Sequence, residues 1–258
     1  MNNDLRIKII EMIKRSGEGH IPSSFSIVDV INHLYTHVLK YEASNPKWPE
    51  RDYFILSKGH GAAALYAVLH KVGFLKDEDL YNYSSPKGIL GGHPDMTIVP
   101  GAEASTGSLG HGFPTAVGVA LGHKILKLSN KVYALLGDGE CHEGTIWEAA
   151  NIAANQNLNN LCAIVDWNGS AAQLMPKDDL PEKWKAFGWE VFVIDGHSET
   201  DLILTFDLIM QSTTINPKVI VAKTVKGKGV SFMNGHGKWH HRIPNEEEFS
   251  LAVKELTQ

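Results

Sequence analysis

Apolar residues recur along the chain with two different spacings. Spacing of three and four residues, typical of amphipathic helices, runs through 5–13, 27–38, 64–72, 146–154 and 246–256. Short uninterrupted apolar runs, typical of strands buried on both faces of a parallel sheet, occupy 132–136, 161–165, 191–194 and 219–222. Because strands and helices alternate, we expect an α/β fold: a doubly wound, mostly parallel sheet flanked by helices, in one domain over residues 1–258.

One segment has unusually small side chains. Residues 107–128 combine a glycine-rich turn with a helical run that carries Gly118, Ala120 and Gly122. We expect this helix to pack closely against another element, because these residues leave little side chain between the backbones.

Composition narrows the possible functions. A net charge of −5, with no cluster of Lys and Arg, argues against nucleic-acid binding. No apolar run approaches the ~18 residues that a membrane span needs, and acidic residues interrupt the first helix, unlike a signal peptide. The two cysteines, Cys141 and Cys162, lack metal-type spacing, so we expect a cytoplasmic protein.

Polar residues follow two of the predicted strands. Asp138 stands between two glycines after the first strand, and Asn168 precedes Gly169 after the next. A right-handed crossover brings both strand ends to one edge of the sheet, where parallel sheets bind ligands. A carboxylate and an amide oxygen suit Mg²⁺ or Ca²⁺ that shares phosphate oxygens. The glycines allow a close backbone approach, and a helix starting near Thr145 adds its positive end. Each motif alone is typical of an ordinary turn; together they favour a metal–diphosphate site.

Seven segments in order carry a family resemblance: GEGHIPSS, ILSKGHGAAALY, GGHPDMTIVPGAEASTGSLGHG, GDGECHEG, DWNG, KTVKGKGVSFM and KWHHRIPNEEE. This series resembles the N-terminal half of transketolase, which binds the diphosphate of thiamine diphosphate. The resemblance extends from about residue 5 to the end of the chain.

The resemblance implies a set of cofactor and metal ligands. Asp138 and Asn168 would bind the metal, Mg²⁺ or else Ca²⁺ or Mn²⁺, through their side chains, and Ser170 through its carbonyl. Gly139 would pack against the diphosphate, and Glu143 would meet the partner domain near the cofactor. Three successive residues would approach the cofactor rings: Gly107, Ser108 and Leu109.

The resemblance also assigns roles to histidines. Four of them would line the substrate channel: His20, His60, His93 and His240. His60 and His240 would also approach the phosphates. Imidazoles suit this place, because ketol transfer moves protons on and off carbonyl and hydroxyl oxygens near neutral pH. We expect ordinary structural or surface roles for His33, His37, His70 and His123, and leave His197, His236 and His241 open.

Family members need a second domain, which binds the aminopyrimidine and supplies a glutamate. The resemblance therefore implies the N-terminal subunit of a split transketolase, moving a two-carbon ketol unit from a ketose to an aldose. We expect it to be inactive alone and active with a separate C-terminal subunit, in a two-fold heterotetramer, with an exposed apolar surface for the partner.

The sequence departs from the family pattern near the substrate side. The departures are Ile21-Pro22-Ser23-Ser24, His111, Cys141-His142 and a short loop over 169–184. They leave the cofactor ligands intact, so we expect ketol transfer on a specialised sugar.

Three other interpretations are weaker. A related thiamine-diphosphate subunit, resembling deoxyxylulose-phosphate synthase or a 2-oxo acid decarboxylase, is disfavoured by His240 and the KGKG segment. A non-catalytic scaffold is disfavoured by the intact Asp138, Asn168 and channel histidines. Nicotinamide binding fails because no early strand leads into a G-x-G-x-x-G helix start.

Overall fold

The computed structural model describes residues 2–172, 175–235 and 237–258. Within them, five parallel strands form one sheet in the order β1-β2-β3-β5-β4. The strands are β1 (Tyr53–Leu56), β2 (Val132–Gly137), β3 (Leu161–Trp167), β4 (Glu190–Asp195) and β5 (Lys218–Lys223). The expected parallel α/β sheet is confirmed. The sequence missed β1, whose four residues are too few for a clear periodic signal.

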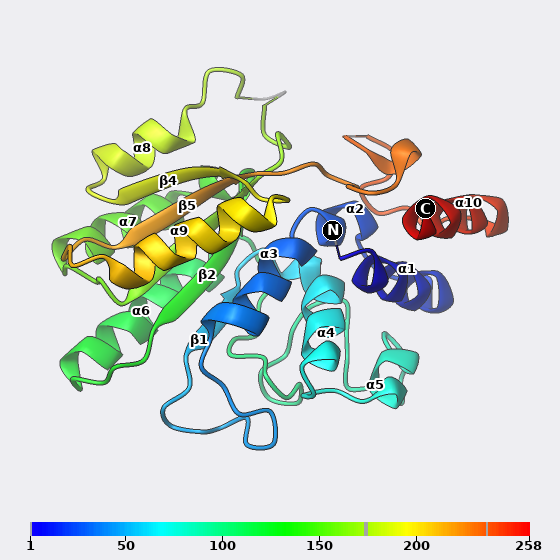
Figure 1. The fold of residues 1–258 in the computed structure, drawn as a ribbon, viewed down its shortest axis with the longest axis horizontal. Helices are drawn as coiled ribbons and strands as arrows, with labels where there is room; N and C mark the ends of the chain where they lie inside the picture. Colours follow the sequence, from blue (N-terminus) through cyan, green and yellow to red (C-terminus); the bar gives the residue numbers. More distant parts are fainter. Residues whose placement is uncertain (1, 173–174, 236) are drawn as a thin grey trace.

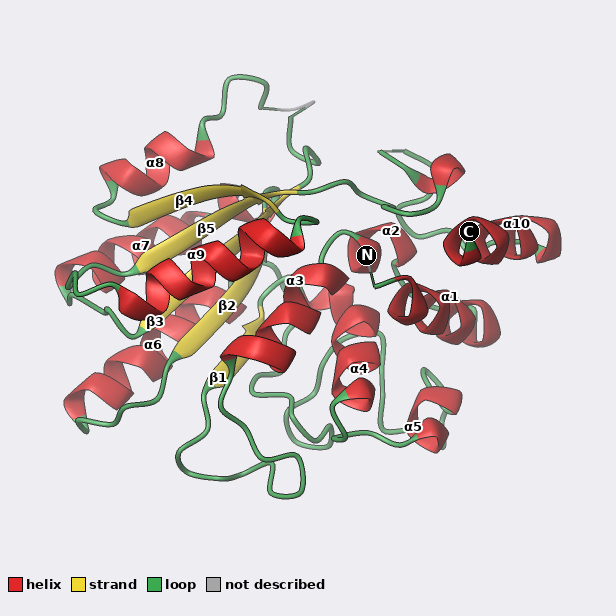
Figure 2. Ribbon diagram, in the orientation of Figure 1, coloured by secondary structure: helices red, strands yellow, loops and turns green. Residues whose placement is uncertain are grey.

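Helices cover both faces of the sheet (Figures 1 and 2). The helices are α1 (Asn3–Ser16), α2 (Ile21–Phe25), α3 (Val28–His33), α4 (Ala62–Lys71), α5 (Asp77–Tyr81), α6 (Gly112–Ile125), α7 (Gly144–Asn155), α8 (Leu180–Ala186), α9 (Glu199–Gln211) and α10 (Glu246–Thr257). One apolar core lies between the sheet and α6, α7 and α8, and a second joins the opposite face to α1–α4 and α9. The doubly wound arrangement is therefore confirmed. None of the described helices has the length and apolarity to cross a bilayer.

The central strands contribute to both cores alternately. In β2, Tyr133 and Leu135 face one core, while Ala134 and Leu136 face the other. Such burial on both faces explains the uninterrupted apolar runs in the sequence. For β4 that expectation is wrong: Val193 is 46% exposed, because β4 is an edge strand with a single neighbour.

The small-residue helix packs on one side only. Phe113, Ala116 and Ala120 lie on the face of α6 turned to the sheet and are fully buried. At Gly118 and Gly122, a Cβ would have no atom within 4 Å. The expectation of close packing is thus wrong for these two glycines within this chain, since they lie on the helix face away from the sheet.

Candidate functional site

The two polar motifs do lie at one edge of the sheet. β2 and β3 are neighbours with Gly137 opposite Asp166, and the Asp138 amide donates to the Asp166 carbonyl over 3.1 Å. The Asp138 side chain is buried, and its Oδ1 accepts from the Gly139 amide at 2.8 Å. Its Oδ2 has no hydrogen-bond partner among the residues described. A buried carboxylate oxygen without a partner is costly, so its surroundings suit a cation.

Electrostatics at Asp138 support the same conclusion. Burial raises the pKa of its carboxyl group, and the nearby Asp166 carboxylate raises it further. The amides of Gly139 and Gly169 and the Lys58 ammonium oppose this rise. Burial thus disfavours the ionised form of Asp138 in this chain alone. A bound divalent cation would stabilise that form.

Asn168 and Ser170 form a fixed turn beside Asp138. Asn168 Oδ1 accepts from the amide and hydroxyl of Ser170, and its Nδ2 donates to Asp166 Oδ2 at 2.8 Å. In the described part of the chain, no three His, Cys, Asp or Glu side chains are placed to hold a metal ion. The predicted site would have one carboxylate, with amide, carbonyl, phosphate and water oxygens as its other ligands. The metal set Asp138, Asn168 and Ser170 stays a prediction.

Glycines leave space along the same edge. A Cβ on the exposed Gly139 would meet no atom within 4 Å, so a diphosphate has room there. A Cβ on Gly107 would stand 3.1 Å from His93 Cδ2, so the His93 ring packs directly over this loop. The adjoining Ser108 is exposed and Leu109 is half-buried.

The glycine loop, residues 107–110, is fixed to the start of α7. Gly110 has a φ of +79°, and a Cβ there would come within 2.8 Å of Glu143 Cβ. The Thr145 hydroxyl donates to the Gly110 carbonyl at 2.7 Å. Glu143 itself is exposed at the N-cap of α7, where its side chain is free to meet another subunit.

Glu140 is an important residue that the sequence did not single out. Its buried Oε1 accepts from the Ser57 hydroxyl at 2.5 Å and the Gly110 amide at 3.0 Å, while Oε2 accepts from the Gly137 amide at 3.2 Å. It therefore connects the ends of β1 and β2 to the glycine loop. Burial raises the pKa of this carboxyl group. Its only sequence signal is its place directly after the Gly-Asp-Gly.

Asp166, at the end of β3, is a second residue that the sequence missed. Its Oδ2 accepts from Lys58 Nζ at 2.6 Å and from the Ser26 hydroxyl at 2.8 Å, and the Thr224 hydroxyl donates to Oδ1. Lys58 and Asp166 are each only 1% exposed. Burial raises the pKa of Asp166, but the Lys58 charge and these hydrogen bonds lower it below its usual range. The buried pair holds Asn168 in place through Asp166.

The predicted channel histidines come together from distant segments. The ring centroids of His20 and His60 lie 5.3 Å apart, those of His20 and His240 also 5.3 Å, and those of His60 and His240 6.2 Å. His241, whose role the sequence did not indicate, joins the group, with its ring centroid 4.6 Å from that of His20. The exposed His93 is near enough to lower the pKa of His20.

Lys226 joins the histidines to the Asn168 turn. Its Nζ lies 3.1 Å from His240 Nδ1 and donates to the Ser170 hydroxyl at 3.3 Å. The Lys226 side chain is buried, and burial lowers the pKa of its ammonium group. The KGKG segment was expected to matter, but no local pattern in it indicated this residue.

The environment of the cluster favours neutral imidazoles. Burial is the largest cause that lowers the pKa of His20 to about 4, and the neighbouring His241 and His240 add to it. Burial, followed by the Lys58 charge, holds the pKa of His60 well below its usual range, and burial with Lys226 lowers that of His240. A neutral ring carries one N–H donor and one acceptor nitrogen, so each can exchange a proton with a substrate oxygen.

We expect His20 to titrate near pH 4 in the folded chain. Its folded pKa lies below the unfolded value, so its stabilising effect is present above about pH 6.5 and is lost as the pH falls towards 4. NMR of the ring protons would show the midpoint, and His20→Gln should reduce the slope of the stability profile between these values. A midpoint near 6.5 would contradict the buried environment.

Residues 1–256 match the family described as transketolase, thiamine diphosphate binding domain. The chain belongs to the transketolase family. Among similar proteins, an apulose-4-phosphate transketolase subunit of Phocaeicola vulgatus is 38% identical over 258 residues, covering 98% of this chain and 91% of that protein. The 6-deoxy-6-sulfo-D-fructose transketolase subunit SqwG of Clostridium sp. is 40% identical over 259 residues, covering 98% of this chain and 94% of that protein.

Longer transketolases match over part of their length. The human transketolase is 38% identical over 260 residues, which cover 98% of this chain and 41% of the human protein. The crystal structure of Campylobacter jejuni transketolase superimposes with a TM-score of 0.92 at 31% identity, covering 99% of this chain and 42% of that chain. This chain thus spans about two-fifths of these transketolases, and the fold of their thiamine-diphosphate-binding domain is shared.

The residues expected to depart from the transketolase pattern have the following places in the structure. Ile21–Phe25 forms α2 directly after His20, and the Ser23 carbonyl accepts from Lys58 Nζ at 3.3 Å. His111 is exposed, its Nδ1 2.9 Å from the Leu109 carbonyl. Cys141 is fully buried, whereas His142 lies exposed, 3.5 Å from Asp178. The loop over 169–184, expected to be short, includes residues 173–174, which lie outside the described residues.

The remaining histidines have structural surroundings. His33 stacks on His37 at 4.8 Å, His70 lies 2.8 Å from Asp77, and His123 packs edge-on to Tyr53. His197 Nδ1 lies 2.8 Å from Asp29 Oδ2, and its Nε2 accepts from the Val225 amide at 2.9 Å. His236 lies outside the described residues.

Proposed function

We propose that this chain is the N-terminal subunit of a split transketolase that, with a separate C-terminal subunit, moves a two-carbon ketol unit from a ketose to an aldose. The observation that carries the proposal is the buried Oδ2 of Asp138 beside the Asn168 turn, to which the described residues offer no hydrogen bond. A buried carboxylate oxygen without a partner lowers the stability of the fold, and a bound cation would remove this cost.

The chain's own residues have distinct tasks in this reaction. Asp138, Asn168 and the Ser170 carbonyl would hold Mg²⁺, and Gly139 would admit the diphosphate, with His60 and His240 near its oxygens. Thiamine diphosphate, when bound, supplies the nucleophilic carbon that cleaves and re-forms the sugar carbon–carbon bond. Residues Gly107, Ser108 and Leu109 would position its rings.

The histidines would handle protons. Neutral His20, His60 and His240 would donate to the carbonyl oxygens of the sugars and exchange protons with their hydroxyl groups, and His93 would hydrogen-bond to the same sugars. The short distances among the rings of His20, His60 and His240, which come from distant segments, support this shared task. Glu143, exposed beside the glycine loop, would complete the site by meeting an acidic group of the partner near the cofactor.

A partner surface adjoins the site. The groove between α6 and α7, about 580 Å³, runs from Gly110 past Pro114 and Gly118 to Ile152. Ile152 is 50% exposed and Ile125, at the end of α6, is 70% exposed. We propose that a separate pyrimidine-binding subunit covers this groove, and that two such pairs form a heterotetramer. The similar proteins that are named as transketolase subunits, and the open side of α6, support this arrangement.

The substrate and location follow as finer proposals. Similar proteins are named for apulose 4-phosphate and 6-deoxy-6-sulfo-D-fructose, and the departures around His20 and His111 adjoin the substrate side. We therefore propose a specialised sugar in place of the ordinary pentose phosphates. Cys141 and Cys162 are both buried and free, which supports a reducing cytoplasm.

We expect ketol transfer only when this chain and its C-terminal partner are mixed with thiamine diphosphate and Mg²⁺. The assay would pair a panel of ketoses and aldoses and follow each product by mass spectrometry. Each of the two chains by itself, and the mixture with Asp138→Asn, are the controls. A mixture that assembles but transfers nothing contradicts the proposed function; a normal preference for pentose phosphates contradicts only the specialised sugar.

A further inference from the structure

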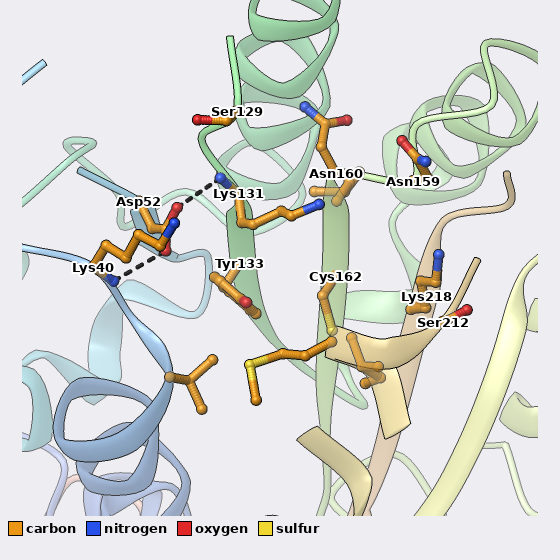
Figure 3. A pocket seen from close by; sticks show the side chains of 14 residues that line it. Lys40, Asp52, Ser129, Lys131, Tyr133, Asn159, Asn160, Cys162, Ser212 and Lys218 are labelled. Carbon is orange, nitrogen blue, oxygen red and sulfur yellow. Dashed lines mark hydrogen bonds between the residues drawn. The ribbon is translucent and has the colours of Figure 1, made fainter. Parts of the chain in front are cut away.

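A second cavity, of about 230 Å³, opens at the other end of the sheet (Figure 3). Its floor is formed by residues at the starts of β2, β3 and β5, among them Tyr133, Cys162 and Lys218. Asp138 and Asn168 follow the opposite ends of β2 and β3. The cavity is therefore separated from the proposed transketolase site by the length of the strands, and the ketol-transfer reaction does not use it.

The lining carries an excess of positive charge. Lys40, Lys131 and Lys218 line it, against one carboxylate, Asp52. Both oxygens of Asp52 accept from backbone amides: Oδ1 from Lys131 at 2.7 Å and Oδ2 from Lys40 at 3.0 Å. Across the described ranges, none of the ion pairs involves any of these lysines. Their ammonium charges are thus left without a carboxylate partner at ion-pair distance.

A second carboxylate, Glu190, lies opposite Lys218 in the β4–β5 register. It does not line the cavity, and its Oε2 accepts from the hydroxyls of Ser212 at 3.2 Å and Thr214 at 2.6 Å. Glu190 therefore moderates the positive charge of the lining but does not pair with it.

Two buried polar groups face the cavity with unused hydrogen-bonding capacity. Lys218 is 3% exposed, and its Nζ makes one hydrogen bond, to the Thr214 carbonyl at 3.1 Å, leaving two N–H donors. Tyr133 is 4% exposed, and within the described part of the chain its hydroxyl takes part in no hydrogen bond. In Figure 3, the Tyr133 ring stands between Asp52 and Cys162, while Lys131 reaches towards Asn160. Both groups can therefore donate a hydrogen bond to a molecule that enters the cavity.

We propose that this cavity binds a small organic anion. Its phosphate or carboxylate group lies among Lys218, Lys131 and the Tyr133 hydroxyl, and its carbon skeleton packs against Leu161, Ile209 and Met210. The volume is below the ~300 Å³ at which pockets for drug-sized molecules begin, so the ligand is a compact metabolite-sized molecule. Ammonium groups that have no carboxylate partner select an anion over a neutral sugar or a metal cation.

Calorimetric titration of the full chain tests this site. The probes are inorganic phosphate, glycerol 3-phosphate and succinate, each raised to about 10 mM, a range that reveals dissociation constants up to about 1 mM. We expect saturable binding of at least one organic anion. If only glycerol 3-phosphate binds, the anionic group is a phosphate; if only succinate binds, it is a carboxylate. No saturable binding of either organic anion, or binding of inorganic phosphate alone, overturns the proposal.

Variants connect the binding to these side chains. Lys218→Met is expected to weaken binding about tenfold or more, since it removes a charge-assisted hydrogen bond. Lys131→Met and Tyr133→Phe should weaken it several-fold, and they keep the test decisive if Lys218→Met does not fold. Lys185→Met, an exposed lysine of α8, is the matched control and should change nothing. Affinity equal to wild type in all three cavity variants contradicts the site.

Discussion

Asp138→Asn is expected to lower the affinity for thiamine diphosphate with Mg²⁺ by about a hundredfold or more in the two-subunit complex. Loss of an outer-sphere partner of a bound metal typically weakens binding 10–100-fold, so loss of the proposed carboxylate ligand should reach or exceed that range. The substitution keeps the shape of the side chain and the hydrogen bond from the Gly139 amide. Calorimetry with the wild-type and variant complexes measures the difference.

The stability of the cofactor-free chain separates loss of a ligand from loss of the fold. Burial raises the folded pKa of Asp138 above its unfolded value, so its ionised form disfavours folding, and stability falls as the pH rises through that folded pKa. Asp138→Asn should therefore leave the free energy of unfolding at pH 7 unchanged or increased. Asp207→Asn, on the exposed side of α9, is the matched control. Unaltered cofactor affinity, or lost affinity together with unfolding, would count against the metal role.

Asp166→Asn is expected to destabilise the folded chain by about 3–5 kcal/mol, the usual result of leaving one member of a buried ion pair without its partner. Lys58 would remain 1% exposed without its carboxylate, and the hydroxyls of Ser26 and Thr224 would lose a charged acceptor. Urea unfolding followed by circular dichroism at pH 7 measures this change.

A double-mutant cycle attributes the effect to the pair. Lys58→Met with Asp166→Asn should destabilise by less than the sum of the two single substitutions, because neither charge is then left buried alone. The folded pKa of Asp166 is lowered, so its stabilising effect is present above the unfolded value near 3.8 and is lost as the pH falls through the folded pKa. Additive effects, or a single-substitution effect below about 1 kcal/mol, would show that the pair is not important.

The sequence predicted those parts of the fold that repeat at short range. Helical spacing identified α1, α4, α7 and α10, and apolar runs identified the strands that lie inside the sheet. The strand β1 was not predicted, because its four residues give no clear periodic signal. The strand β4 is half-exposed, because its place at the edge of the sheet depends on topology and not on its own residues. Likewise, the open side of α6 appears only once the sheet is placed on its other side.

The candidate site was predictable where its residues follow strand ends. Asp138 and Asn168 do so directly, and parallel pairing brought them to one edge. Glu140, Asp166 and Lys58 were not identified, since their roles arise from contacts with residues 83 and 108 positions away in the chain. Lys226 meets His240 and Ser170 only in the folded protein. Such contacts between distant segments leave no local spacing to detect.

The central claim is that this chain holds the metal–diphosphate half of a site that a second subunit completes. The most direct measurement is a calorimetric titration of thiamine diphosphate with Mg²⁺ into this chain, into its candidate C-terminal partner, and into their mixture. We expect tight binding, one cofactor per pair of subunits, in the mixture only, and much weaker binding to either chain alone. No binding to the mixture, or binding to this chain alone as tight as to the mixture, would contradict it.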